Sequence, residues 1–291
     1  MLTPQSTIWV ERLLWIAAGV TTAMSVGDAV VHRSGAMRLT STIVVWSVFG
    51  VVVLAVMVPS ALGLTVVRTA APLAVVGAVS SWIGGASPVV GAAAVGLAAV
   101  HTAFALSADV GGAFVQASAY GNERRFLLRA PFAYLVPLVV SWLVWCALLV
   151  AAVLVLGASR WLVGGLLGAA ALVLGRFVIT RYHRLSRRWL VIVPAGVVVH
   201  DHLVLGETTM VTRSNVLAMR LALADTVAAD FTGPASGHAI EVEVREMITA
   251  LLAPTRRAPR GTALHVQAFI IAPSRPGLAL TYATEQRLPV G

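Results

Sequence analysis

Residues Thr69–Ala108, TAAPLAVVGAVSSWIGGASPVVGAAAVGLAAVHTAFALSA, run for 40 residues without a single Asp, Glu or Arg. A helix needs ~20 apolar residues to cross the ~30 Å hydrocarbon core of a bilayer, so this run is too long for one spanning helix. Its middle, Gly84-Gly85-Ala86-Ser87-Pro88, is rich in turn-forming residues. The run therefore predicts two membrane-spanning helices, at about 69–84 and 88–107.

Further apolar runs flank this one and predict four more spans, at about 13–31, 42–64, 131–157 and 161–180, the last with Arg176 near its end. The first of them contains Asp28, and Glu11 and Arg12 stand at its head. A cleaved signal peptide is the alternative for this segment, but its start is not strongly basic and no Ala-x-Ala site follows it. We interpret it as a retained signal-anchor helix, which makes residues 1–183 a transmembrane bundle of about six spans.

The composition supports this division into a membrane part and a polar tail. Hydrophobic residues make up 58% of the chain and charged residues 11%, against ~25% charged in an average soluble domain. Most of the charge lies after residue 176. The net charge of +9 fits the positive-inside rule and attraction to anionic lipid headgroups. Nucleic acid is not an expected partner, because no basic stretch is interleaved with aromatic residues.

Arginine counts in the loops predict the orientation of the chain. With the N-terminus inside, nine arginines face the cytoplasm and three face the opposite side. The inner set is Arg12, Arg68, Arg124, Arg125, Arg129, Arg181, Arg184, Arg187 and Arg188. The tail, residues 184–291, is thus expected in the cytoplasm. Basic positions are Arg without Lys, beside abundant Ala, Val, Leu and Gly, which is typical of a G+C-rich genome and indicates a bacterial cell membrane.

Beyond Arg188 the hydrophobic pattern acquires the period of two residues that marks β-strands. Ile240, Val242 and Val244 alternate with charged residues, so they should face a core. A helix should follow, with Ser274 as its N-cap. The expected elements are strands near 189–193, 197–204, 208–212, 216–221, 239–244 and 263–271, and a helix at 274–288 with Leu278, Tyr282 and Leu288 inward.

This order of strands closed by one helix resembles a pleckstrin-homology-like (PH-like) domain over residues ~186–288. The segment RWLVIVPAGVVVHD, residues 188–201, is similar to the opening strands of bacterial PH-like domains that follow membrane spans. The segment APSRPG, residues 272–277, is similar to the start of their last helix. The loops at 232–238 and 254–261 depart from a compact version. The resemblance implies a membrane-associated binding or assembly module and brings no catalytic residue.

Asp28 and His101 are the candidate intramembrane polar pair. A carboxylate in lipid costs several kcal/mol unless it is paired, hydrated or protonated, so such residues mark functional sites by default. Together they would form a proton relay. In the alternative, Asp28 meets the interface or His32, and His101 hydrogen-bonds a neighbouring helix.

Arginines at the cytoplasmic ends of the spans form a candidate collar for anionic headgroups, worth ~1 kcal/mol each. The collar comprises Arg124, Arg125, Arg129, Arg181, Arg184, Arg187 and Arg188. The alternative is that these arginines serve topology alone. His200 and His202 share one face of a strand, but two imidazoles leave a zinc shell incomplete. We expect no metal and no cofactor.

The sequence contains no His-Glu-x-x-His, Gly-x-Ser-x-Gly or Walker motif, and an aspartyl protease would need a second intramembrane Asp. The leading hypothesis is accordingly a non-enzymatic scaffold or assembly factor whose cytoplasmic PH-like domain binds a protein partner or anionic lipid. The alternative is a small transporter or channel subunit that uses Asp28 and His101. Small-residue spacing such as Gly164 and Gly168 would also permit a homo-oligomer.

Overall fold

The computed structural model describes residues 3–255 and 258–291 and separates into two compact units. The helical unit comprises Met1–Phe114 and Pro137–His183. The β-rich unit comprises Val115–Val136 and Arg184–Gly291. The sequence-based division at residue 183 put 115–136 with the helices, whereas the structure groups this segment with the strands.

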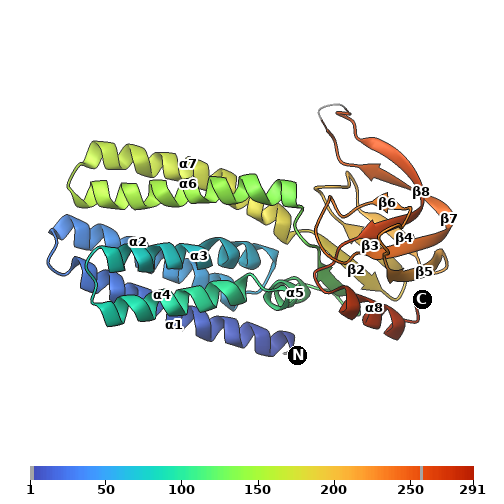
Figure 1. Cartoon of the computed structure of the whole chain (residues 1–291), viewed down its shortest axis with the longest axis horizontal. Coiled ribbons are helices and arrows are strands. Elements are labelled where there is room, and N and C mark those ends of the chain that lie inside the picture. Colours follow the sequence, from blue (N-terminus) through green and yellow to red (C-terminus); the bar gives the residue numbers. More distant parts are fainter. Residues whose placement is uncertain (1–2, 256–257) are drawn as a thin grey trace. The chain divides into compact units, whose positions relative to one another are not determined.

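Within residues 3–255 and 258–291, six helices are long and apolar enough to cross a membrane, which confirms the expected number of candidate spans. These are α1 Pro4–Val30, α2 Gly35–Met57, α3 Ala61–Ile83, α4 Pro88–Ala105, α6 Phe132–Gly157 and α7 Trp161–Ser186. A short helix, α5 Ala108–Gln116, was not expected. Figure 1 shows α1 to α4 running alongside one another, with α6 and α7 as a hairpin.

The break between α2 and α3 lies at residues 58–60, and not between residues 64 and 69 as expected. Ser60 begins α3, and its hydroxyl accepts a hydrogen bond from Gly63 N at 3.0 Å. A Cβ at Gly63 would lie 2.7 Å from the Ala55 carbonyl oxygen, so glycine lets the start of α3 approach the end of α2. The cap at Ser60, and not the charge at Arg68, therefore marks where the helix starts.

Small side chains let the first four helices pack closely. Helix α1 contacts α2, α3 and α4, and α3 contacts both α2 and α4. Ala71, Ala74 and Ala78 on α3 and Ala94 and Ala98 on α4 are buried. Close approach of this kind is how helices associate where no water drives them together.

The β-rich unit holds two four-stranded sheets, in the orders β1-β2-β3-β4 and β5-β7-β8-β6. Neighbouring strands are antiparallel except β6 and β8, which are parallel. The strands are β1 Arg124–Leu127, β2 Trp189–Val193, β3 Gly196–His200, β4 Thr209–Thr212, β5 Val216–Leu221, β6 Ala229–Asp230, β7 Ile240–Leu252 and β8 Thr262–Ile271.

Strand β1 was missed by the sequence analysis. It precedes α6 and α7 in the chain, yet it pairs with β2, which follows them, in the register Phe126↔Leu190. Phe126 is 4% exposed and belongs to the core that Leu190 and Ile192 also build. The hairpin of α6 and α7 is thus inserted between the first two strands of the β-rich unit.

The inward face of β7 was predicted correctly, since Ile240, Val242 and Val244 are all fully buried. The closing helix α8, Pro276–Glu285, is shorter than expected. Its N-cap is Arg275 and not Ser274, with no side-chain cap. Its buried residues are Ala279 and Ala283, with Leu288 buried just beyond the helix and Leu278 exposed.

Replacing Phe126 by alanine should destabilise the β-rich unit by about 3–5 kcal/mol, because a buried aromatic ring leaves a cavity. Tyr120→Ala is the matched control, since the Tyr120 side chain is 89% exposed on the same segment. The full chain is unfolded with urea in detergent, and unfolding is monitored by cleavage of residues 189–291 with a protease. The difference in the free energy of unfolding between the two variants is the result. Equal stability of the two variants would show that β1 is not part of the core.

Candidate functional site

Two arginines inside the helical unit donate hydrogen bonds to the last carbonyl groups of neighbouring helices. Arg12 on α1 donates from Nε to the carbonyl oxygen of Val56 at 3.0 Å, at the end of α2. Arg68 on α3 donates from Nη2 to the Ser107 carbonyl oxygen at 3.0 Å and from Nε to that of Ala105 at 3.3 Å. The last carbonyls of a helix carry partial negative charge, so a guanidinium there satisfies them and complements the dipole.

Asp28 performs the opposite task at a helix start. Its Oδ2 atom accepts a hydrogen bond from the backbone N–H of Ser87 at 2.6 Å, and Ser87 is the N-cap of α4. A carboxylate is favourable there because the first N–H groups of a helix are unsatisfied and carry partial positive charge. The structure therefore does not bring Asp28 and His101 together, and the expected pair is replaced by two separate interactions.

His101 pairs instead with Glu11. The Nε2 atom of His101 lies 2.7 Å from Oε1 of Glu11, and both side chains are fully buried. The ring of Trp15 packs against the imidazole with centroids 5.2 Å apart. Arg68 interacts electrostatically with Glu11 from α3. A carboxylate, an imidazole and a guanidinium from three helices are thus gathered inside the helical unit.

Glu11 was overlooked because the first span was expected to begin at residue 13. In the structure α1 begins at Pro4, with Thr3 as N-cap, so Glu11 lies two turns inside the helix. The signal was present in the sequence. Threonine followed by proline is a favoured start of a helix, since the cap accepts an orphan N–H and proline needs no partner at the first position.

The Glu11–His101 pair can hold and exchange a proton between two atoms at hydrogen-bond distance. Each residue also keeps a buried atom, Glu11 Oε2 and His101 Nδ1, without a hydrogen bond among the described residues. Buried polar atoms without partners are costly, so they point to a role beyond packing. Arg12, Arg68 and Asp28 each form a hydrogen bond with a helix end, whereas this pair forms none.

In the β-rich unit, several arginines of the candidate collar are already engaged. Arg188 is 1% exposed and forms two hydrogen bonds of 2.7 Å with the carboxylate of Asp201. Arg129 donates to the carbonyl oxygen of His238, and burial lowers its pKa. Outside this unit, on α7, Arg181 lies over the Phe177 ring at 4.0 Å. Arg188 therefore serves the fold and is closed to a headgroup.

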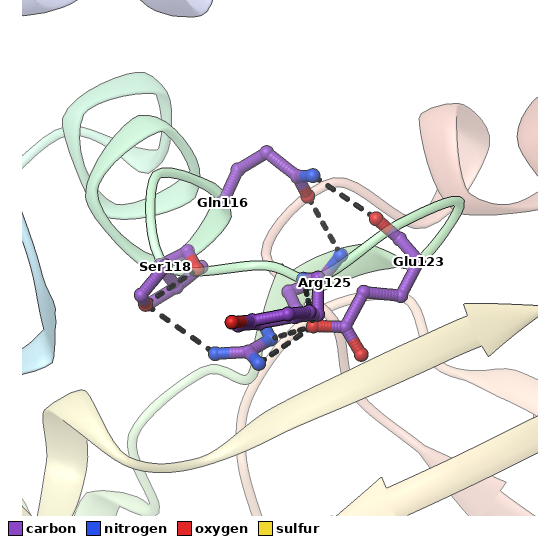
Figure 2. A network of polar contacts seen from close by, with 6 residues as sticks. Gln116, Ser118, Glu123 and Arg125 are labelled. Atoms are coloured by element: carbon purple, nitrogen blue, oxygen red, sulfur yellow. Dashed lines mark hydrogen bonds and ion pairs between the residues drawn. The ribbon is translucent and has the colours of Figure 1, made fainter.

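Arg125 is the centre of a network that holds the segment before β1 in place (Figure 2). Its guanidinium donates to Oε1 of Glu123 at 2.6 and 3.1 Å and to the Ser118 hydroxyl at 3.3 Å. The Gln116 side chain accepts from Arg125 N and donates to the Glu123 carbonyl oxygen. Arg125 also lies 5.2 Å from the ring centroid of Trp189 on β2. These contacts tie the segment to the strand that it must join.

Three collar arginines form no ion pair, side-chain hydrogen bond or ring contact in the part of the chain that the structure describes. They are Arg124, which is half-buried, and Arg184 and Arg187, which are exposed. A guanidinium without an internal carboxylate is available to anionic groups outside the protein. These three are what is left of the expected collar.

His200 and His202 lie edge to face, with ring centroids 4.3 Å apart. His200 also stacks on Trp189 at 5.0 Å, and its Nδ1 lies 2.9 Å from the Thr208 hydroxyl. Burial, followed by the charges of His202 and Arg187, lowers the pKa of His200 to about 4. Neither residue belongs to a group of three or more His, Cys, Asp or Glu able to hold a metal within residues 3–255 and 258–291.

Comparison with known proteins gives no match, whether to a protein-family model, to a curated protein or to a solved structure. The function must therefore be argued from the residues and their geometry.

The lowered pKa of His200 predicts a loss of stability in acid. The unfolded chain takes up the proton near pH 6.5 and the folded chain near pH 4, so the free energy of unfolding falls as pH drops from 6.5 to 4, by at most about 3 kcal/mol. Thermal unfolding of the full chain in detergent at pH 7 and pH 4.5 measures it. His200→Gln should show a smaller difference between the two pH values, and an equal difference would contradict the assignment.

Proposed function

We propose that this chain is a multipass protein of the bacterial cell membrane whose β-rich unit is a PH-like domain acting as a non-enzymatic scaffold. The six apolar helices anchor the domain, and the domain recruits a partner protein to the cytoplasmic surface. The positive-inside rule favours a cytoplasmic β-rich unit. Arg12 and Arg68 bind helix ends, and without them the inner arginines still outnumber the outer ones.

The observation that carries the proposal is the pairing of β1 with β2 across the inserted hairpin. Chain segments on both sides of α6 and α7 enter the same sheet, in the register Phe126↔Leu190. A domain attached through one linker has a single chain connection to its anchor, whereas this one is joined to the α6–α7 hairpin through both ends of the hairpin. Such attachment suits a module that must present a binding surface at the membrane.

The architecture of the β-rich unit supports the PH-like assignment. Two sheets, built largely from antiparallel neighbours, enclose one core, and α8 closes it with Ala279 and Ala283. The core is completed by strand β1, which the resemblance over residues ~186–288 did not include. Exposed Arg184 and Arg187 would add attraction to anionic headgroups of ~1 kcal/mol each.

An apolar surface for the partner is offered by the connection between β5 and β6. Leu223 is 72% exposed and Val227 is 96% exposed, and Leu221 at the end of β5 is 46% exposed. These exposed apolar side chains lie within seven residues of the chain, and exposed apolar patches mark protein interaction sites. We place the contact with the partner at this connection.

Replacing Leu223 and Val227 together by serine should weaken partner binding at least tenfold, since apolar anchors contribute 1–2 kcal/mol each. Met247→Ser is the control, because Met247 is 69% exposed on β7 outside the connection. The full chain is purified from its host membrane in mild detergent, and co-purifying proteins are quantified by mass spectrometry. A stoichiometric partner held equally by both variants would contradict the contact at this connection, and the absence of any stoichiometric partner would contradict the scaffold.

The Glu11–His101 pair favours one second candidate, a proton-conducting subunit or transporter. A fully buried carboxylate and imidazole at 2.7 Å, with one unpartnered atom on each in the described chain, is an arrangement suited to proton exchange. In this version Glu11 takes the part that the sequence analysis gave to Asp28.

Glu11→Gln should lower proton flux at least tenfold if the pair conducts protons, because the amide cannot exchange the proton. Asp28→Asn is the matched intramembrane control, since Asp28 caps α4. Flux is measured in proteoliposomes with a pH-sensitive dye under a potassium diffusion potential. Wild-type protein that conducts no more than empty liposomes would exclude this candidate and leave the scaffold untouched.

A further inference from the structure

The helical unit contains a partly enclosed apolar pocket of about 450 Å³, lined by side chains of α1, α2, α3 and α6. Its volume lies within the ~300–1,000 Å³ range of small-molecule pockets. On α1 the lining runs from Trp15 to Val30, which spans about 22 Å at ~1.5 Å per residue. The pocket is therefore long and thin, the shape of one extended hydrocarbon chain.

Trp15 closes the deep end of the pocket. The ring is 1% exposed, and its Nε1 donates a hydrogen bond to the Phe49 carbonyl oxygen at 3.2 Å. The ring also stacks on Phe49, with centroids 6.0 Å apart. It packs as well against His101, which pairs with Glu11. The fixed indole gives the pocket a definite floor and separates it from the buried ion pair.

Arg33 stands at the opposite end, just beyond the last residue of α1. It is the one ionisable side chain in the pocket lining that the structure describes. It is exposed, and its Nη2 donates to the Gly84 carbonyl oxygen at 3.1 Å. A guanidinium has five N–H donors, so this single bond leaves others for an anion. Charge and apolar lining are thus arranged as the head and the tail of an amphiphile.

We propose that this pocket binds one acyl chain of an anionic phospholipid, with its phosphate at Arg33 and its chain end at Trp15. The inference rests on membrane insertion, which is part of the proposed function, but not on the PH-like domain. An unfilled apolar cavity of this size forfeits dispersion contacts that a hydrocarbon chain restores. The ~22 Å depth exceeds half of a ~30 Å hydrocarbon core, so the site should favour long chains.

Photo-crosslinking in nanodiscs tests the proposal. The full chain is reconstituted in phosphatidylcholine with a trace of phosphatidylglycerol that carries a diazirine at the end of one long chain. The label is expected near Trp15 and on the lining of α6, and Val26→Trp, which fills the pocket, should reduce it about tenfold. Val20→Trp is the matched control, because Val20 lies on α1, is 37% exposed and does not line the pocket.

The role of Arg33 is tested by attaching the same diazirine-labelled chain to phosphatidylcholine instead of phosphatidylglycerol. Labelling should then fall several-fold, and Arg33→Gln should abolish this preference while Arg160→Gln, at an exposed arginine outside the pocket, keeps it. This comparison decides the matter if Val26→Trp does not fold. Labelling equal to that of outward-facing Leu172 and Val173 on α7 would show surrounding lipid only and overturn the site.

Carbonate extraction of membranes separates the two possible failures. A chain released by carbonate would refute membrane insertion, and with it the proposed function. A chain retained in the membrane but without preferential labelling of the pocket would refute the lipid site alone.

Discussion

The pairing of β1 with β2 is the contact on which the β-rich unit depends. Phe126 and Leu190 lie opposite each other although the whole α6–α7 hairpin separates them in the chain. Closing so long a loop costs conformational entropy, and the cost is offset by burial of Phe126 in the core and by the Arg125 network before the strand. Because the chain leaves this sheet after β1 and re-enters it at β2, the sheet cannot form without both segments that flank the hairpin.

The helical unit, which we propose spans a membrane, would obey a different constraint, because hydrocarbon offers no hydrogen-bond partners. Several of its charged residues match the signs of the helix dipoles. Asp28 meets the N-terminus of α4, and Arg12 and Arg68 meet the C-termini of α2 and α4. Against this regularity the Glu11–His101 pair is an exception. It lies two turns inside α1 and satisfies no helix end, which is why it is the stronger candidate for a proton-dependent step.

Trp15 connects the two unusual features of the helical unit. One set of contacts joins its ring to His101, and another joins it to Phe49 at the floor of the apolar pocket. A chain seated in the pocket would press on the same side chain that packs against the buried pair. Lipid occupancy and the state of His101 would then be coupled through one indole ring.

The sequence by itself determined the six apolar helices, the turn at residues 84–88 and the inward face of β7, because run length and the period of two residues are local properties. The pair Thr3-Pro4 also marks the start of α1, although the predicted span began only at residue 13. Only the tertiary structure decided that His101 meets Glu11, that Asp28 caps α4 and that β1 joins β2. These are meetings of residues from distant segments, and they depend on how helices and strands pack in three dimensions, which no local pattern in the chain encodes.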